Sequence, residues 1–93
     1  MQAAQEYTHP FTGIISAESQ AELEKLARDS EAARIVRLDF AAVKRINSMG
    51  VALLLKVLKQ LKQAGKTIHI TGANPMTRTL FRMMGITHWA VIH

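Results

Sequence analysis

Apolar and polar side chains alternate in short segments, which is the pattern of a strand with one buried face. The clearest segment is 34–40, where every second residue from Val36 to Phe40 is apolar. Residues 67–71 repeat the pattern with isoleucines against threonine and histidine. Residues 89–92 predict a short final strand. These segments are spaced so that helices fit between them.

The N-terminal segment, residues 7–15, is apolar enough for a strand but contains Pro10 and Gly13. Proline has no N–H to donate to a strand ladder. We therefore expect either an edge strand or a bent hairpin here, with antiparallel pairing at the edge of the sheet as an open alternative.

A long apolar helix is predicted to begin at the polar residues Asn47 and Ser48. Either residue can cap it by accepting hydrogen bonds from the free N–H groups of the first turn. Leu53 and Val57 widen its apolar face, so the helix should lie broadly against a sheet. The main positions of that face are Val51, Leu54, Leu55, Leu58 and Leu61. Gly65 stands where a helix ends with a left-handed residue.

Two shorter helices are predicted on either side of this one. Ser16 is expected to cap a helix over residues 17–28. Asn74 as N-cap and Pro75 as first residue predict the start of the last helix, which ends at Gly85. Its apolar side chains are Met76, Leu80, Phe81 and Met84.

Strands that alternate with helices predict an α/β fold, a small mixed and mostly parallel sheet flanked by helices. The 93 residues, 48% of them hydrophobic, suit a single domain over residues 1–93. No apolar run reaches the roughly 18 residues of a membrane span, and no signal peptide is visible. With no cysteine in the chain, we expect a cytoplasmic protein without direct membrane insertion.

The net charge of +5 matters only if the cations gather on one surface. The candidates are Lys56, Lys59, Lys62, Lys66, Arg78 and Arg82. They form either a solvated surface or a site for an acidic protein, nucleic acid or anionic lipid. No aromatic residue is interleaved with them, so no nucleic-acid partner is expected.

The sequence predicts no catalytic site, no metal site and no cofactor. The histidines form no His-x-x-x-His pair and have no accompanying carboxylate cluster. Ser48 lies at a strand-to-helix turn, but the Gly-x-Ser-x-Gly pattern of a nucleophile is absent. Asp39 has no second carboxylate with which to divide acid and base roles.

Ser48 has two interpretations. It either caps the helix or is a phosphorylation site. A phosphate would add about −1.5 to −2 charges at a helix N-terminus, where the helix dipole tolerates anions. The fold would survive while the local surface changed sign.

The segment 35–55 resembles the STAS domain, the fold of bacterial anti-sigma factor antagonists. That family has a hydrophobic strand, a loop of the type Asp-Ser-Ser/Thr-Gly and an apolar helix, and the loop here reads Asn47-Ser-Met-Gly50. The likeness extends over residues 34–93, including Gly65 and the pair Gly85–Ile86.

The resemblance implies a non-enzymatic interaction module that binds a serine kinase, itself an anti-sigma factor. Phosphorylation of Ser48 would regulate this binding, and dephosphorylation would restore it. The implied partner-binding residues are Asn47, Ser48, Met49, Gly50, Val51 and Leu54. Two departures matter: Asn47 removes the charge beside the hydroxyl, and Met49 replaces a hydroxyl with a flexible apolar side chain.

The resemblance also leaves a second role open. Some STAS modules are fixed subunits of membrane complexes that transport lipids or anions. In that case the partner is a transporter ATPase subunit, and Ser48 only caps the helix.

Overall fold

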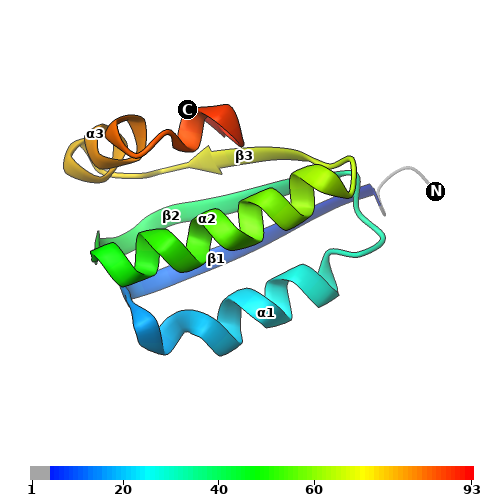
Figure 1. The fold of residues 1–93 in the computed structure, drawn as a ribbon, viewed down its shortest axis with the longest axis horizontal. Coiled ribbons are helices and arrows are strands. Elements are labelled where there is room, and N and C mark those ends of the chain that lie inside the picture. The colour runs from blue at the N-terminus through cyan, green and yellow to red at the C-terminus, as the bar shows by residue number, and fades with distance from the viewer. Residues whose placement is uncertain (1–4) are drawn as a thin grey trace.

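The computed structural model describes residues 5–93, which form one four-stranded sheet and three α-helices (Figure 1). The strands follow the order β1-β2-β3-β4, and every pairing between neighbours is parallel. The strands are β1 (Glu6–Ile15), β2 (Ile35–Ile46), β3 (Thr67–Thr71) and β4 (Val91–Ile92). The helices are α1 (Gln20–Asp29), α2 (Ser48–Gln63) and α3 (Pro75–Met83). The predicted α/β class is confirmed.

The N-terminal strand corrects one detail of that prediction, because the sheet of residues 5–93 is fully parallel rather than mixed. β1 runs parallel to β2, and α1 supplies the crossover connection that a parallel pair needs. β1 is one strand of ten residues, so the bent hairpin does not occur. The edge position is confirmed, and the register shifts beside Pro10 and Gly13 show where the ladder is interrupted.

β2 is longer than predicted, because residues 41–46, expected to cross to the helix as a connection, continue the strand. In this stretch Val43 and Ile46 are buried while the residues around them are exposed, so the alternation of a strand is lost. The extension pairs only with β1, since the pairing with β3 ends at Asp39. It carries the start of α2 beyond the end of β3.

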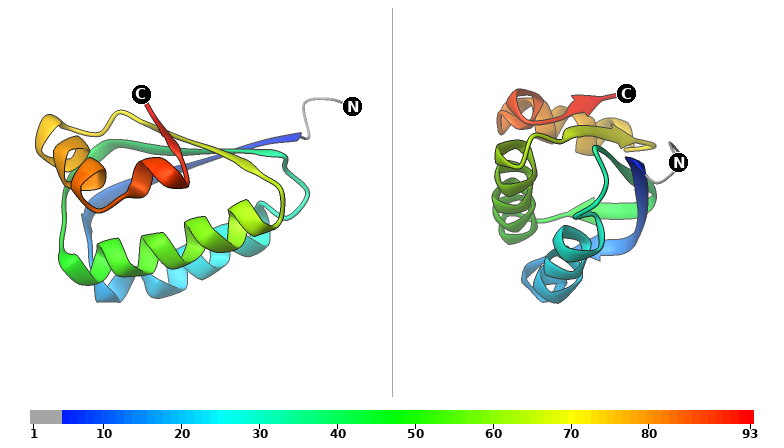
Figure 2. Two further views of the ribbon diagram at one scale, coloured as in Figure 1. Left: turned by 45° about the horizontal axis from the view of Figure 1, so that its top comes forward. Right: turned by 90° about the vertical axis from the view of Figure 1, so that its right-hand side faces the viewer.

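Both α1 and α2 pack on the same face of the sheet, as the two views in Figure 2 show. Fully buried side chains fill the space between these two helices and the sheet, including Phe11, Leu23, Leu26, Leu38, Phe40, Leu54, Leu58, Ile68 and Ile70. The opposite face carries half-buried polar side chains such as Arg37, Asp39, His69 and Thr71. Parallel strands covered on both faces read as continuous apolar runs, so the alternation in β2 and β3 reflects burial on one face only.

α3 packs against the sheet through Phe81, whose ring lies edge-on to that of Phe40 with centroids 5.4 Å apart. The predicted start of this helix is confirmed. Asn74 Oδ1 accepts a hydrogen bond from the N–H of Thr77 at 2.8 Å, and Pro75 is the first helical residue. The cap fixes the direction in which α3 leaves the sheet.

The apolar face predicted for α3 is only partly right. Phe81 is fully buried and Leu80 is half-buried, but Met76 is 79% exposed and Met84 is 47% exposed. At 3.6 residues per turn, five positions place Met76 on a different side of the helix from Phe81. A nine-residue helix brings only one narrow stripe to the sheet, and Met76 lies outside it.

Two other boundaries differ from the prediction. Ser16 caps a short 3-10 turn, η2 (Ala17–Ser19), and α1 begins only after it. The final strand is shorter than 89–92, because the chain first forms a second 3-10 turn, η3 (Ile86–His88), and then a bend. Among residues 5–93, no helix has both the length and the hydropathy needed to cross a membrane.

Candidate functional site

A single residue, Asn47, connects β2 to α2 and caps the helix. Its side-chain Oδ1 accepts a hydrogen bond from the N–H of Gly50 at 2.8 Å, which satisfies one free donor of the first turn. Its own N–H donates to the carbonyl oxygen of Ile15 at 3.1 Å and so ties the loop to the end of β1. Of the two residues considered for the cap, Asn47 is therefore the N-cap of α2.

Ser48 is the first residue of α2, and it is exposed. Within the described part of the chain its hydroxyl makes no hydrogen bond. The first turn of α2 contains no acidic residue, and the helix dipole gives it a partial positive charge. A phosphate on this oxygen would therefore lie outside the core in a favourable field.

Gly50 allows the first turn of α2 to approach the end of β1 closely. A Cβ at this position would lie 2.3 Å from the carbonyl oxygen of Ile15 and 2.9 Å from Cγ1 of Ile46. Such distances are shorter than van der Waals contact, so only glycine fits. The ends of two strands and the start of α2 meet here, which fixes the place of Ser48 relative to the sheet.

Only three of the six residues predicted to bind a partner are accessible. Asn47, Ser48 and Met49 are exposed, Met49 to 55%. The other three are buried: Gly50, Val51 and Leu54. Their burial packs α2 against the sheet, so we expect direct partner contact from Asn47, Ser48 and Met49 and positioning of the helix from the buried three.

We call the connection from β2 to α2 at Asn47 the Asn47 loop. α3 lies at the same end of the sheet as this loop (Figure 1). Asn74 Nδ2 donates to the carbonyl oxygen of Lys44 at 3.2 Å, joining the start of α3 to the end of β2. The exposed apolar side chains of α3 were missed, because the sequence pattern placed Met76 in the core. The sequence does contain a signal for this second apolar side: Met83 follows Met76 by seven residues, so both lie on the same side of the helix.

The six cations considered as an anion-binding set do not form one free surface. Lys66 is buried, and its Nζ donates to the carbonyl oxygens of Glu31 at 2.9 Å and Ala33 at 2.5 Å. Arg78 donates to a backbone carbonyl oxygen at the start of α3, and Lys59 lies over an aromatic ring. Three of the six therefore already have roles inside the fold.

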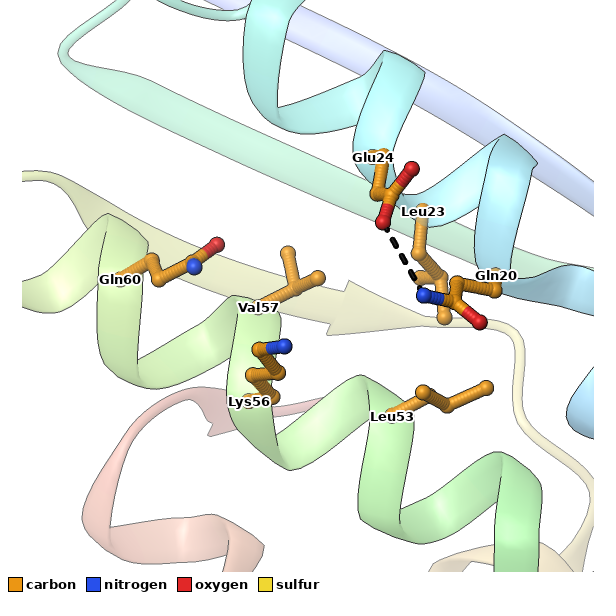
Figure 3. Close-up of a pocket in the computed structure, with 7 residues that line it drawn as sticks. All are labelled: Gln20, Leu23, Glu24, Leu53, Lys56, Val57 and Gln60. Carbon is orange, nitrogen blue, oxygen red and sulfur yellow. Dashed lines mark hydrogen bonds between the residues drawn. The ribbon is translucent and has the colours of Figure 1, made fainter.

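A small hollow lies between α1 and α2 (Figure 3). Leu23 and Val57 supply its apolar part, and Gln20, Glu24 and Lys56 supply polar groups around it. Its volume is about 60 Å³. Pockets for small molecules typically measure about 300–1,000 Å³. The hollow is therefore too small for a ligand of that kind.

The histidines contact other parts of the fold individually. His9 Nε2 lies 2.7 Å from a carboxylate oxygen of Glu22, which links β1 to α1. His69 Nδ1 lies 2.7 Å from His93 Nε2 on the polar face of the sheet. Among residues 5–93, no three potential metal-ligating side chains come together. These contacts support structural roles for His9 and His69.

The free energy of unfolding should decrease as the pH is lowered through the range in which His69 becomes protonated. Burial lowers the pKa of His69 below its usual 6.5, and the positive charges of Arg37 and His93 lower it further. A histidine with a lowered folded-state pKa contributes stability above pH 6.5, and this is lost as pH falls through the folded-state pKa. We expect an NMR titration to place the midpoint of His69 below 6.5. Arg37→Gln should raise it, and an unchanged midpoint would contradict the contribution of the Arg37 charge to the shift.

Residues 11–92 match the family model described as "Mlab, STAS domain". No protein of curated function matches the sequence significantly. The structure is similar to the anti-sigma factor antagonist SpoIIAA in its unphosphorylated form, with a TM-score of 0.72 and 15% identity. That match covers 96% of this chain and 80% of that one.

Two transport-related structures are also similar. A sulfate transporter family protein from Wolinella succinogenes gives a TM-score of 0.80 at 12% identity, covering 94% of this chain and 76% of that one. The SulP transporter STAS domain from Vibrio cholerae gives 0.78 at 18% identity, covering 94% and 73%. At such identities the likeness shows a common fold, and function has to be argued from the site.

Proposed function

Because this chain belongs to the STAS domain family, as the resemblance predicted, we propose that it is a non-enzymatic protein-interaction module of the anti-sigma factor antagonist type. STAS domains are generally non-catalytic modules that bind protein partners. The proposed partner is a serine kinase that is also an anti-sigma factor. Phosphorylation of Ser48 regulates the complex.

The exposure of Ser48 at the first position of α2 carries this proposal. A kinase can reach the hydroxyl without unfolding the helix, because Asn47 supplies the cap. Asn47, Ser48 and Met49 form a continuous exposed segment that a partner can cover. A phosphate there changes the charge of the contact surface and leaves the core intact.

Asn47 adapts this site in a specific way. It keeps the capping hydrogen bond to Gly50 that an aspartate would also make. It carries no charge, so the hydroxyl of Ser48 has no carboxylate next to it in sequence. A kinase of this chain recognises Ser48 without such a carboxylate, and Met49, which is 55% exposed, offers it an apolar contact.

Ser48→Asp should weaken binding to the partner about tenfold or more, which corresponds to about 1.4 kcal/mol. The added charge would be buried at the contact surface without a matching cation. The partner is the protein that co-purifies with the full chain, and its affinity for purified variants is measured by calorimetry. Intact-mass analysis after incubation with that partner and ATP should show one phosphate, absent in Ser48→Ala.

Thr67→Asp provides the matched control, since Thr67 is exposed at the opposite end of the sheet. It adds the same charge and should leave the affinity unchanged within about twofold. Equal affinities for wild type and Ser48→Asp would contradict the proposed contact surface. A phosphate found on another residue would contradict the switch.

A second candidate function is that of a fixed subunit in a membrane transport complex. The neutral Asn47 in place of the family's acidic residue favours it, and so does the similarity to the SulP transporter STAS domain. In this case the partner is an ATPase subunit, and Ser48 is never phosphorylated. A stoichiometric complex recovered from membranes, with Ser48 unmodified by mass analysis, would support this function over the first.

A further inference from the structure

Helix α3 has two apolar sides, one packed on the sheet and one largely exposed, with the half-buried Leu80 at its boundary with the core. Phe81 and Thr77 face the interior, and both are buried. The other side carries Met76, which is 79% exposed, and Met83, which is 77% exposed. We call the side formed by Met76, Thr79, Leu80 and Met83 the α3 outer face.

The α3 outer face is a continuous surface and not a scatter of single exposed residues. Together with Pro75, its four residues line a shallow depression of about 500 Å³ that is mostly apolar. Isolated exposed apolar residues are normal on protein surfaces, whereas a contiguous patch marks an interaction site. Methionine side chains are flexible and polarizable, so they adapt to the surface they meet.

The α3 outer face belongs to the same end of the molecule as Ser48. The side chain of Asn74 donates to the carbonyl oxygen of Lys44, three residues before Asn47. The turn before α3 also packs closely on β2, because a Cβ on Gly72 would lie 2.9 Å from the backbone nitrogen of Ala41. A partner that covers the Asn47 loop can therefore extend onto α3.

The segment that contains α2, β3 and α3 carries charged residues of one sign. No acidic residue follows Asp39 in the sequence, whereas eight lysines and arginines do. Lys44, Arg45 and Arg82 of this group are exposed near the ends of β2 and α3. A partner surface rich in aspartate and glutamate would gain favourable interactions here, and a basic one would be repelled.

We propose that the α3 outer face binds an amphipathic helix of the protein partner, whose apolar side chains are flanked by acidic residues. The proposal rests on the proposed function, because it extends the surface at Ser48. Met76, Leu80 and Met83 follow the spacing i, i+4, i+7, which matches the anchors of a helix laid along another helix. The acidic flanks pair with Arg82, Lys44 and Arg45.

The surface fits a second copy of this chain less well. The exposed acidic residues of the chain include Glu18, Glu22 and Glu24 around α1. Among residues 5–93, the large exposed hydrophobic side chains are Ile14, Met49, Met76, Met83, Met84 and Val91, and none belongs to α1. The acidic side of one copy thus lacks the apolar anchors that the α3 outer face of another would need.

Photo-crosslinking tests this proposal directly. A photo-reactive phenylalanine analogue is placed at position 76 or 83 of the full chain in cells, with position 63, exposed at the far end of α2, as the control. The expected product joins position 76 or 83 to a helical segment of another protein that contains apolar and acidic residues. Crosslinks to this chain itself, to lipid, or at no more than the yield from position 63 would each overturn it.

Affinity measurements then quantify the contact, using the purified partner that crosslinking has identified. The double variant Met76→Glu, Met83→Glu should bind at least about tenfold more weakly. Met76→Leu, Met83→Leu should bind within about twofold of wild type. The control Gln60→Glu, Gln63→Glu changes the net charge equally on exposed residues of α2 and should bind normally. Unchanged affinity in the methionine-to-glutamate variant would overturn the proposal. Circular dichroism confirms that each variant is folded.

The same affinity measurements, with Ser48→Asp added, distinguish this proposal from the proposed function. If Ser48→Asp binds normally while the methionine-to-glutamate variant does not, the α3 contact stands and the phosphorylation-regulated site fails. If Ser48→Asp binds weakly while the methionine-to-glutamate variant binds normally, the α3 contact fails and the proposed function stands.

Discussion

Gly50→Ala should lower the free energy of unfolding by about 3 kcal/mol, at the upper end of the usual effect of overpacking. The added methyl group would lie 2.3 Å from the carbonyl oxygen of Ile15 and 2.7 Å from its carbonyl carbon. Both atoms are backbone, so the clash can be relieved only if α2 moves away from β1. Urea unfolding monitored by circular dichroism measures the change.

Gly65→Ala is the matched control for this substitution. Gly65 has a φ of 84°, and nothing lies within 4 Å of a Cβ built on it. An alanine there meets only the cost of the left-handed backbone, which is about 1–2 kcal/mol. If Gly50→Ala were no more destabilising than Gly65→Ala, the close approach of α2 to β1 would not be the reason for this glycine.

Phe40→Ala should lower the free energy of unfolding by about 4 kcal/mol, within the range for a fully buried phenylalanine. Phe40 is 1% exposed and lies between two other aromatic rings. Its centroid is 5.2 Å from that of Phe11 on β1 and 5.4 Å from that of Phe81 on α3. The substitution removes the aromatic contact between the sheet and Phe81 of α3. Thermal unfolding measures the total effect.

Two further measurements distinguish the loss of this contact from a general loss of volume. Phe40→Leu keeps most of the apolar volume and should lower the free energy of unfolding by only about 1–1.5 kcal/mol. In Phe40→Ala, hydrogen exchange should accelerate more at amides of α3 than at those of α1, because Phe81 loses its partner. Equal acceleration in both helices would show that the aromatic contact does not anchor α3.

The strands and helices with strong local signals were predicted well. Ile68 and Ile70 alternate with polar residues between two glycines, and β3 spans the predicted residues 67–71. The cap at Asn74 and the end of α2 near Gly65 were also predicted, because both depend on the backbone needs of a single residue. Local chemistry decides such positions, so the sequence contains them.

The pairing partner of β1 could not be predicted in the same way. Alternation shows that a segment has one buried face, but it does not show which strand lies beside it or in which direction. The extension of β2 was hidden for a related reason. Val43 and Ile46 are three residues apart, which fits the bulged pairing with β1 and not a regular strand.

The candidate site was predicted in place but not in detail. Ser48 and Asn47 lie at the turn where the sequence put them. Val51 and Leu54 were assigned both to the apolar face of α2 and to the partner surface, and one side chain cannot serve both. Both side chains are buried, which favours the apolar face of α2. Met76 shows the opposite error, since an apolar residue was assigned to the core because hydrophobicity alone does not say which of two surfaces a side chain meets.

The interruptions in β1 have a consequence for the behaviour of the protein at high concentration. β1 lies at the outside of the sheet, and an exposed strand edge is a template for aggregation with another chain. Pro10 removes one hydrogen-bond donor from the middle of this strand, and the irregular register near Gly13 bends it. An incoming strand would find no regular ladder longer than a few residues. Pro10 and the irregular register near Gly13 should therefore also disfavour polymerisation through the β1 edge.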